Sequence, residues 1–423
     1  MQTFTNFEFI QIYRVGKEKS KLILFTTDYP FGFLEPFLET EIHNLSEGFD
    51  EVIIVTTSVS EIQTRKIPDN CKVERFNLML NSMQKMLSLS NSFNAIFLNE
   101  LAIIRNVYNL PISKGIIFTM LISLTRARRV RKKVELIFKN KDNNENLFFY
   151  SYWCDDVALG LAMAQVEFPK IKTLCRIHRW DVYFDESTVN YLPFRHTIAQ
   201  QIGKIVSISQ DGIDYAKAVW KTGLDEKFVL SRLGINNSVT PMIIERNYCL
   251  LVSCSNIIPV KRVHLILEAL QEITETAIKW VHFGDGSERK ALETLITKLP
   301  SNIQVELMGR RDNKEIYTYY KEHRPDLFIN VSSSEGVPVS IMEAMSFGIP
   351  VIATNVGGTG EIVNNDNGCL LSHSPSATDV AGAIIEFTQL SRNQLIVKRK
   401  HSFDTWNLEY NAEVNYKKFI EQI

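Results

Sequence analysis

Short apolar runs alternate with longer segments of helical spacing along most of the chain. The runs are rich in β-branched and aromatic residues, and each has the length of a buried strand. They lie at 21–28, 51–58, 145–153, 173–178 and 203–209 in the first half, and at 248–255, 278–286, 303–309, 326–335 and 349–355 in the second. Strands that alternate with helices indicate parallel βαβ units, so we predict two doubly wound α/β sheets.

The alternation is interrupted over residues 234–247, where two asparagines, a serine and Pro241 stand close together. We place a domain boundary in this segment. The prediction is a Rossmann-like N-terminal domain over 1–238, a Rossmann-like C-terminal domain over 239–403, and a helix over 404–423 that packs back toward the N-terminal domain. A chain of 423 residues is long enough for two such domains.

The composition limits the possible binding partners and the cellular compartments in which the protein could work. The formal net charge of −1 argues against nucleic acid as the main partner, because phosphate binding requires a surplus of basic residues. The six cysteines are dispersed, without C-x-x-C pairs, so we expect reduced thiols in a cytoplasmic protein and no structural zinc. No apolar run is long enough to cross a bilayer, and residues 1–20 lack the apolar core of a signal peptide.

Loops rich in glycine and polar residues follow several strands of the second half. Ligands of open α/β sheets bind beyond the carboxyl ends of the strands, so these loops predict a polar cleft that faces the other domain. The G-x-G-x-x-G fingerprint is absent, because Arg289 occupies the third glycine position of the segment 284–289. No P-loop sequence is present either. These absences argue against a dinucleotide dehydrogenase and a P-loop NTPase.

The segment 332–358, "SSSEGVPVSIMEAMSFGIPVIATNVGG", offers a different anion site. A strand leads into a loop with Pro338, and a short helix follows. The free backbone N–H groups and the positive end of such a helix bind anions, so a diphosphate would fit there. Glu335 and Glu343 would flank it, and their carboxylates could accept hydrogen bonds from sugar or ribose hydroxyls. Alternatively, Ser340 and Glu343 form a capping box, in which case Glu343 satisfies only the backbone.

These residues resemble the donor-site signature of the family 4 retaining glycosyltransferases. The resemblance rests on Glu335, Gly336, Pro338, the spacing from Glu335 to Glu343, and the trailing glycine pair. Other segments extend it: "PVKRVHLILEAL" resembles the phosphate-binding lysine and following helix of that family, "HFGDGSE" its Gly-Asp-Gly loop, and "ELMGRRDNKEIYTYY" its base-side loop. The family has the GT-B fold, in which two Rossmann-like doubly wound domains face each other across a cleft.

The resemblance implies a role for each matching residue. Glu335 would contact the transferred sugar, Glu343 the ribose hydroxyls, and Lys261 the diphosphate. The implied donor-binding residues are Gly32, Asn256, Arg262, Gly284, Gly309, Arg310, Gly336, Val337, Pro338, Val339, Ser340 and Glu343. One position departs from the family, which usually has arginine where this chain has Asn256. A cationic contact to the leaving phosphate would then be missing unless Arg262 supplies it, and its loss would lower the rate.

Two segments of the first half are candidates for the opposite wall of the cleft. The loop around Gly32, in the segment 25–42, resembles the loop of the family that approaches the donor from the acceptor side. A tight turn between strand and helix explains Gly32 equally well. Glu35 and Glu39 are interpreted as acids of the first helical turn, which the helix dipole favours.

The segment 173–186 ends a buried strand in polar and aromatic residues. His178 stands where the family carries a histidine near the transferred sugar, and a purely structural histidine is the alternative. Trp180 and Tyr183 could stack on an acceptor sugar or could belong to the core. The acceptor-binding residues that we predict are Arg179, Trp180, Asp181 and Tyr183.

Residues 113–141 combine helical apolar spacing with a run of arginines and lysines. A basic amphipathic helix of this kind can lie on an anionic membrane surface, which would suit a lipid-linked acceptor. A core helix with a solvated basic end is the alternative.

Together, these features predict a retaining hexosyltransferase that moves sugar from a nucleoside-diphosphate sugar to a glycan or lipid-linked acceptor in polysaccharide, lipopolysaccharide or glycolipid assembly. No D-x-D motif is present, so we expect no metal and no other cofactor. The location would be cytoplasmic or peripheral on the inner face of the membrane. Two alternatives remain: another two-lobed sugar-nucleotide enzyme, such as an epimerase or phosphorylase, and a non-catalytic subunit that binds a sugar nucleotide.

Overall fold

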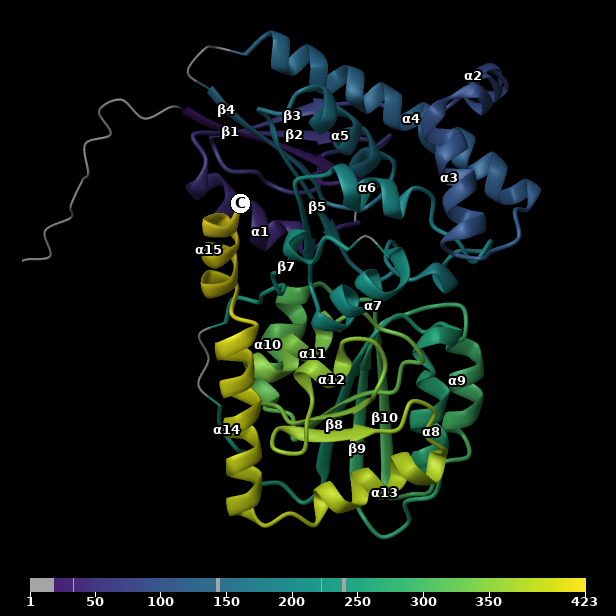
Figure 1. Ribbon diagram of the computed structural model, residues 1–423. Coiled ribbons are helices and arrows are strands. Elements are labelled where there is room, and N and C mark those ends of the chain that lie inside the picture. Colours follow the sequence, from purple (N-terminus) through teal and green to yellow (C-terminus); the bar gives the residue numbers. More distant parts are fainter. Residues whose placement is uncertain (1–18, 33, 142–144, 222, 238–240) are drawn as a thin grey trace, which may run out of the picture.

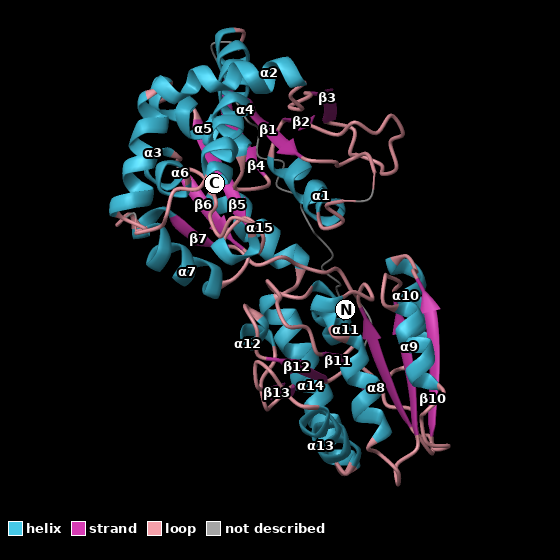
Figure 2. Ribbon diagram, turned by 90° about the vertical axis from the view of Figure 1, so that its right-hand side faces the viewer, coloured by secondary structure: helices cyan, strands magenta, loops and turns pink. Residues whose placement is uncertain are grey.

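The computed structural model describes residues 19–32, 34–141, 145–221, 223–237 and 241–423. Figures 1 and 2 show two α/β domains stacked one above the other, each with helices on both faces of a sheet. Both sheets are parallel throughout the described residues. The prediction of two doubly wound sheets is therefore confirmed.

The N-terminal sheet has seven strands in the order β3-β2-β1-β4-β5-β6-β7. Successive residues of its interior strand β1 point to opposite faces, and both faces are covered. Leu22 and Leu24 enter one core, whereas Ile23 and Phe25 enter the other. The strands are β1 (Lys19–Thr26), β2 (Glu51–Thr56), β3 (Cys71–Arg75), β4 (Glu145–Ser151), β5 (Lys172–Ile177), β6 (Lys204–Ser207) and β7 (Phe228–Leu230).

The C-terminal sheet has six strands in the order β10-β9-β8-β11-β12-β13. Its two faces are also buried, with Val252 in one core and Leu251 in the other. The strands are β8 (Cys249–Cys254), β9 (Ile278–Phe283), β10 (Ile303–Gly309), β11 (Leu327–Asn330), β12 (Val351–Thr354) and β13 (Gly368–Leu371).

Helices connect the strands and cover the sheets. Those of the N-terminal domain are α1 (Leu38–Gly48), α2 (Ser82–Leu87), η1 (Ser88–Phe93), α3 (Ala95–Asn106), α4 (Lys114–Lys139), α5 (Asp156–Glu167), η2 (Phe184–Glu186), α6 (Arg195–Gln201), α7 (Gln210–Trp220) and η3 (Asp225–Lys227). The rest are η4 (Pro259–Lys261), α8 (Val263–Gln271), α9 (Arg289–Ile296), α10 (Asn313–His323), α11 (Val339–Ser346), α12 (Thr359–Ile362), α13 (Ala377–Thr388), α14 (Arg392–Glu409) and α15 (Ala412–Gln422). Among the described residues, no helix is both long and apolar enough to span a bilayer.

Three strands, β3, β7 and β13, were not predicted from the sequence. Each lies at an edge of its sheet, and each is at most five residues long. An edge strand pairs on one side only and needs fewer apolar residues, so its sequence pattern is weak.

The chain returns from the C-terminal domain to the N-terminal domain at its end. Helix α14 lies along the C-terminal domain and α15 lies against the N-terminal domain, as the yellow ribbon in Figure 1 shows. Phe419 of α15 enters the N-terminal core, and Ile420 contacts α1 at Gly48. The predicted boundary at residue 404 is wrong, because α14 continues as one helix to Glu409 and only α15 crosses over.

Candidate active site

The loops that follow β5 and β11 meet between the two domains. Arg179, from the N-terminal domain, donates from Nε to Ser334 Oγ of the C-terminal domain at 2.8 Å. The same guanidinium donates to Glu186 Oε1 at 2.6 Å, and Ser334 Oγ donates to that oxygen at 3.2 Å. The carboxyl ends of the two sheets therefore face each other, and Arg179 is bonded across the cleft. Its predicted role as an acceptor ligand would require this network to open.

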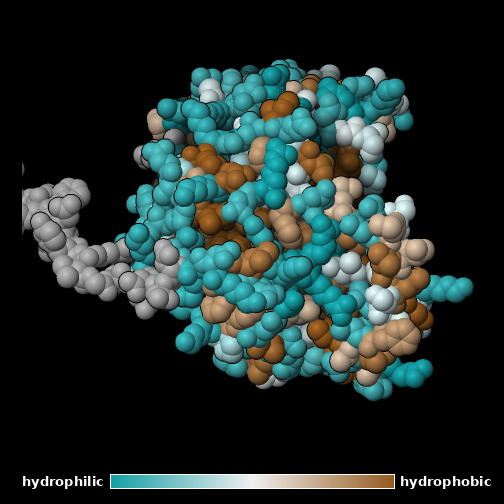
Figure 3. Space-filling view, turned by 90° about the horizontal axis from the view of Figure 1, so that it is seen from above, coloured by the Kyte–Doolittle hydropathy of each residue, from teal (hydrophilic) through white to brown (hydrophobic). Residues whose placement is uncertain are grey.

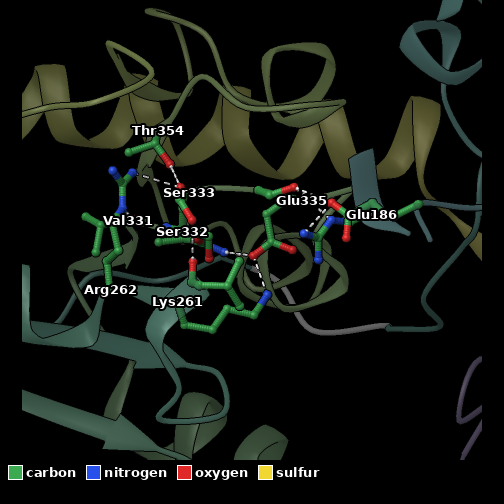
Figure 4. A network of polar contacts seen from close by, with 12 residues as sticks. Glu186, Lys261, Arg262, Val331, Ser332, Ser333, Glu335 and Thr354 are labelled. Atoms are coloured by element: carbon green, nitrogen blue, oxygen red, sulfur yellow. Dashed lines mark hydrogen bonds and ion pairs between the residues drawn. The ribbon is translucent and has the colours of Figure 1, made fainter. Parts of the chain in front are cut away.

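Lys261 and Glu335 form an ion pair at the centre of this region (Figure 4). Lys261 comes from η4, after β8, and Glu335 from the loop after the neighbouring strand β11. Lys261 Nζ donates to Glu335 Oε1 at 2.5 Å, and Asn330 Nδ2 donates to the same oxygen at 3.3 Å. Glu335 is 8% exposed. The structure thus brings together the two residues predicted to bind the diphosphate and the transferred sugar.

The N-terminus of α11 lies immediately after Glu335. Pro338 is its N-cap and supplies no side-chain cap. Among the described residues, the backbone N–H groups of Val337, Val339 and Ser340 have no recorded acceptor. The N–H groups and the helix dipole give this end of α11 the character of an anion site.

The glycine pair Gly357–Gly358 holds the loop before α11 in place. Gly358 N donates to Gly336 O at 2.7 Å. Gly357 has φ of +50°, and a β-carbon there would overlap the carbonyl oxygen of Glu335. Only glycine fits this close approach, which explains the trailing pair of glycines in the motif.

Glu343 lies one turn into α11 and is 5% exposed. Its Oε1 accepts from Asn313 Nδ2 at 3.0 Å and from the Tyr317 hydroxyl at 3.4 Å. The capping-box alternative is wrong, because Pro338 is the N-cap and the side chain of Glu343 turns toward α10. Burial raises the pKa of Glu343 to about 7, although the Tyr317 hydrogen bond partly offsets this.

Glu343 lines a cavity of about 440 Å³ between the two domains. Phe37 and Thr40, at the start of α1, form its N-terminal wall, and Tyr317 and Val339 line the opposite side. An apolar wall beside a buried carboxylate suits a ring that carries hydroxyl groups. The cavity has room for a nucleoside.

Arg262 and Asn256 differ in their freedom to contact a ligand. The Arg262 guanidinium donates to the carbonyls of Val331 (2.7 Å), Ser332 (3.0 Å) and His373 (3.3 Å). Burial lowers the pKa of this arginine. Since three carbonyls already hold it, Arg262 fastens the loop after β8 to that after β11 and is not free to replace the missing arginine. Asn256 is exposed on the loop after β8.

Gly284, Gly309 and Arg310 lie on the loops after β9 and β10. Gly284 N donates to Gly309 O at 2.9 Å, so the two glycines hold these loops together. Arg310 is exposed next to them. The predicted base-side loop thus leads into α10, which carries Asn313 and Tyr317.

His178 lies at the carboxyl end of β5 and is 7% exposed. Its ring centroid is 4.3 Å from that of Trp153 and 5.0 Å from that of Tyr152. Neither ring nitrogen has a hydrogen-bond partner in the part of the chain that the structure describes. A buried polar group without a partner is costly, so this imidazole is available to a ligand.

The remaining predicted acceptor residues do not form one surface. Asp181 is fully buried and accepts from the backbone N–H groups of Cys154 (2.8 Å) and His178 (2.7 Å). Its assignment to the acceptor site is wrong, because the carboxylate joins two loops inside the domain. Tyr183 donates to Asp211 on α7. Trp180 remains accessible, at 46% exposure, and its ring centroid lies 5.1 Å from that of Trp153.

Glu35 organises the loop after β1, a role that was not predicted. It is 3% exposed and accepts from the backbone N–H groups of residues 27, 28 and 29, each at 2.8 Å, and from Trp153 Nε1 at 2.6 Å. Its interpretation as a first-turn helix acid is wrong, since α1 begins at Leu38. Gly32 belongs to the same loop, with φ of +55°, and the Asp28 carboxylate occupies the space that a β-carbon would need.

A second cavity, of about 210 Å³, opens at the carboxyl ends of β1 and β4. Thr27, Trp153, Asp155 and Asp156 line it together with Met79. Burial, and then the charge of Asp156, raise the pKa of Asp155 to about 7. The consecutive aspartates after a predicted strand were the sequence signal for this site, which was not predicted.

The helix predicted over 113–141 is α4, and its apolar side is part of the core. Ile116, Met120, Leu124 and Val130 are all buried there. Several basic residues of α4 are paired, including Arg126 with Asp156 and Lys133 with Glu74. The apolar face of this helix therefore cannot lie on a membrane. Of the alternative, a core helix with a solvated basic end, the core packing is confirmed, whereas several of the basic residues are paired with acids.

Comparison with known proteins adds three findings. Residues 243–401 match the family model described as "Glycosyl transferases group 1". The putative colanic acid biosynthesis glycosyltransferase WcaL of Escherichia coli (strain K12) is 27% identical over 198 residues, which are 45% of this chain and 49% of that protein. The UDP-N-acetylglucosamine–peptide N-acetylglucosaminyltransferase GtfA subunit of Streptococcus parasanguinis is 32% identical over 144 residues, 33% of this chain and 27% of that protein. The chain thus spans about half the length, or less, of these curated relatives.

A solved structure with a similar fold is Anabaena Alr3699/HepE in complex with UDP. It has a TM-score of 0.64 at 17% identity and covers 95% of this chain and 99% of its own. A second structure of that protein contains UDP-glucose and has a TM-score of 0.63. The likeness covers both domains and confirms the predicted fold class, GT-B with two Rossmann-like domains across a cleft.

Proposed function

We propose that the chain transfers a sugar from a nucleoside-diphosphate sugar to an acceptor, since residues 243–401 match the family model described as "Glycosyl transferases group 1". The donor binds to the C-terminal domain and the acceptor to the N-terminal domain. The observation that carries this proposal is the Lys261–Glu335 pair, which lies beside the free N–H groups of α11, on a loop that is bonded through Ser334 to Arg179 of the His178 loop. A cation, an anion site and a carboxylate are the groups that a sugar diphosphate requires.

The proposed reaction retains the configuration at the anomeric carbon. The bond between this carbon and the diphosphate oxygen breaks while the acceptor oxygen forms its bond on the same face. The acceptor proton passes to the leaving phosphate oxygen, so the protein needs no nucleophile. Lys261 and the N–H groups of α11 stabilise the charge of the leaving diphosphate, and this requires no metal in the proposed scheme. Glu335 accepts hydrogen bonds from the sugar hydroxyls, and His178 orients the sugar from the opposite domain.

We assign the nucleoside to the cavity of about 440 Å³, where Glu343 would accept from the ribose hydroxyls. A uridine donor with a hexose sugar is the first candidate. It is supported by the UDP and UDP-glucose complexes of the Anabaena protein and by the donor in the name of the GtfA subunit. The pocket residues Asn313 and Tyr317 would lie next to the base or the ribose.

We propose a glycan or lipid-linked acceptor, bound near Trp180 and the cavity of about 210 Å³. The proposed process is the assembly of cell-surface polysaccharide or glycolipid, which the name of the Escherichia coli relative supports. All six cysteines are free thiols, which supports a cytoplasmic location of the reaction.

A thermal-shift screen against UDP, GDP, ADP and dTDP, with and without EDTA, tests the donor site. A ligand at 100 times its dissociation constant stabilises the native state by about 2.7 kcal/mol. We expect a shift with UDP that persists in EDTA, and a Glu335→Ala variant that keeps this shift but transfers no sugar. Sugar transfer by Glu335→Ala at the wild-type rate would overturn the assignment. Interconversion of sugar nucleotides without acceptor would indicate an epimerase, and a requirement for phosphate a phosphorylase.

A second candidate function is a non-catalytic subunit that binds a sugar nucleotide. It is favoured by the exposed Asn256 at the position of the family arginine, because one stabiliser of the leaving phosphate is missing. The matched relative from Streptococcus parasanguinis is itself named as a subunit. UDP binding without turnover on any acceptor would support this function.

A further inference from the structure

Seven large apolar side chains stand on the surface of α2, η1 and α3 and of the residues just before them. Each is more than half exposed, and together we call them the apolar patch: Met79 (64%), Met83 (62%), Met86 (64%), Leu87 (58%), Leu89 (57%), Phe93 (88%) and Leu98 (52%). In Figure 1, α2 and α3 project from the side of the N-terminal domain. In Figure 3, which looks down on this domain, hydrophobic residues gather at the same end.

The arrangement of the patch is not that of scattered surface residues. Met83, Met86 and Leu87 follow the i, i+3, i+4 spacing that places side chains on one face of a helix. None of the six residues of α2 is buried, so this helix has an apolar face with no core beneath it. Monomeric proteins seldom expose a contiguous apolar surface of this kind unless it binds something.

Basic residues predominate in the segment that carries the patch. Between residues 75 and 134 the sequence contains ten lysines and arginines and a single acidic residue, Glu100. Glu100 is fully buried and does not offset the basic charge at the surface, whereas Arg126, Arg131 and Lys133 are paired with acids outside this segment. The whole chain has a net charge of only −1, which makes this segment a strong local exception.

Several of these basic residues border the patch directly. Lys85 is exposed on α2 between Met83 and Met86. On α4, Arg128 donates to Asn91 of η1, and Arg129 Nη1 lies 3.5 Å from Met79 O. Lys132 is exposed one turn further along α4. The patch therefore has a cationic rim.

We propose that the apolar patch and its basic rim bind the surface of an anionic lipid bilayer. Methionine, leucine and phenylalanine side chains can enter the acyl boundary, while lysine and arginine contact anionic headgroups. A bilayer adapts to a projecting surface with flexible side chains and requires no complementary shape, whereas an ordered protein interface does.

The patch is continuous with the acceptor side of the cleft. Met79 belongs to the patch and also lines the cavity of about 210 Å³ that contains Asp155. A bilayer on the patch would bring the membrane surface to the mouth of that cavity. The proposal goes beyond the proposed function and does not depend on it, because bilayer binding is measured without nucleotide, sugar or acceptor.

Vesicle flotation tests the proposal on the full chain. The probes are vesicles of phosphatidylcholine alone and of phosphatidylcholine with 30% phosphatidylglycerol, at low and high salt. We expect the wild type to float with the anionic vesicles and to be released by salt. The variant M83S/M86S/F93S and the variant K85E/K132E should each bind about tenfold more weakly or worse. All five side chains are exposed, so both variants should melt like the wild type.

Two matched controls come from other surfaces. I396S/V397S/L408S removes three exposed apolar side chains from α14, and K290E/K298E reverses two exposed lysines in and after α9. Both should float like the wild type. The proposal would be overturned if the wild type stayed unbound on anionic vesicles, or if the patch variants floated as well as the controls. It would also be overturned if the patch variants changed only the oligomeric state, which would identify a protein interface.

Discussion

Lys261 Nζ lies 2.5 Å from Glu335 Oε1, and this ion pair joins the loops after two neighbouring strands. The single cation proposed for the diphosphate is therefore already neutralised by the carboxylate proposed for the sugar. A donor would have to divide this pair, with phosphate oxygens on the lysine and sugar hydroxyls on the glutamate. Because the two side chains would bind different parts of the donor, mutation of each should have a different effect on nucleotide binding.

Replacement of either partner should affect nucleotide binding in opposite directions. Glu335→Gln frees Lys261 for the diphosphate, so we expect UDP to bind about fivefold more tightly, the equivalent of about 1 kcal/mol. Lys261→Ala should weaken UDP binding. Both variants should slow sugar transfer by about a hundredfold or more, because each removes a group that stabilises the transition state. Calorimetry with UDP, alongside a transfer assay, separates the two effects. Equal weakening of UDP binding in both variants would contradict this exchange.

Restoration of the family arginine should increase activity. Asn256 is exposed on the loop after β8, and Arg262 is held by three carbonyls and cannot replace the missing cation. We expect Asn256→Arg to tighten UDP binding about tenfold and to raise the transfer rate, because a guanidinium can bind the diphosphate. Asn256→Ala is the matched control and should leave both quantities close to those of the wild type. A loss of activity in Asn256→Arg would show that this chain neutralises the leaving group in another way.

The parts of the site that the sequence predicted are those with local patterns. The loop of Glu335, the lysine before α8 and the glycine pair each lie within a short motif, so their sequence spacing determines their position. The roles of Glu35 and Asp181 could not be predicted in this way. Glu35 bonds to Trp153, 118 residues away, and Asp181 to the backbone at Cys154. Such partners become neighbours only when β1, β4 and β5 assemble into a sheet.

Two alternatives stayed open at the sequence level for the same reason. The sequence around Ser340 and Glu343 is compatible with both a capping box and a ligand site, and only the start of α11 at Val339 decides between them. The apolar spacing of α4 indicates an amphipathic helix, but it does not say whether the apolar side packs on α5 or on a membrane. In both cases a local pattern describes one element correctly and leaves its partner undetermined.

Glu343→Gln should make folding stability less dependent on pH. The folded-state pKa of Glu343 is about 7, above the ordinary value of 4.5, so the folded state holds a proton that the unfolded state releases between these values. Stability is therefore lost as the pH rises from about 4.5 to about 7, and the glutamine variant avoids this loss. We expect it to be more stable than the wild type by up to about 3 kcal/mol at pH 8 and equal to it at pH 4.

Denaturant unfolding at pH 4, 6 and 8 measures this difference. Asp155, whose pKa is also raised, contributes with the same sign to both proteins, so only the comparison of variant with wild type isolates Glu343. The same variant should bind UDP more weakly, since the amide is a poorer acceptor for ribose hydroxyls than a carboxylate. A stability difference that does not change with pH would contradict the raised pKa.

Glu35 and Glu39 form a matched pair, because the sequence suggests the same role for both and the structure gives them different ones. Glu35 is buried and accepts three backbone hydrogen bonds and one from Trp153, whereas the side chain of Glu39 is 57% exposed and lies 3.7 Å from Arg65. Glu35→Ala would leave four donors without their acceptor: three backbone N–H groups of the loop after β1 and Trp153 Nε1. We expect it to lower the free energy of unfolding by about 3 kcal/mol or more, and Glu39→Ala by about 0.5 kcal/mol or less. Denaturant unfolding of the two variants measures both values. The end of this loop, at Pro36 and Phe37, lines the cavity of about 440 Å³. Glu35→Ala should therefore also weaken sugar transfer, and more than UDP binding, which we assign mainly to the other domain. Equal stability of the two variants would mean that the loop is held by its backbone alone.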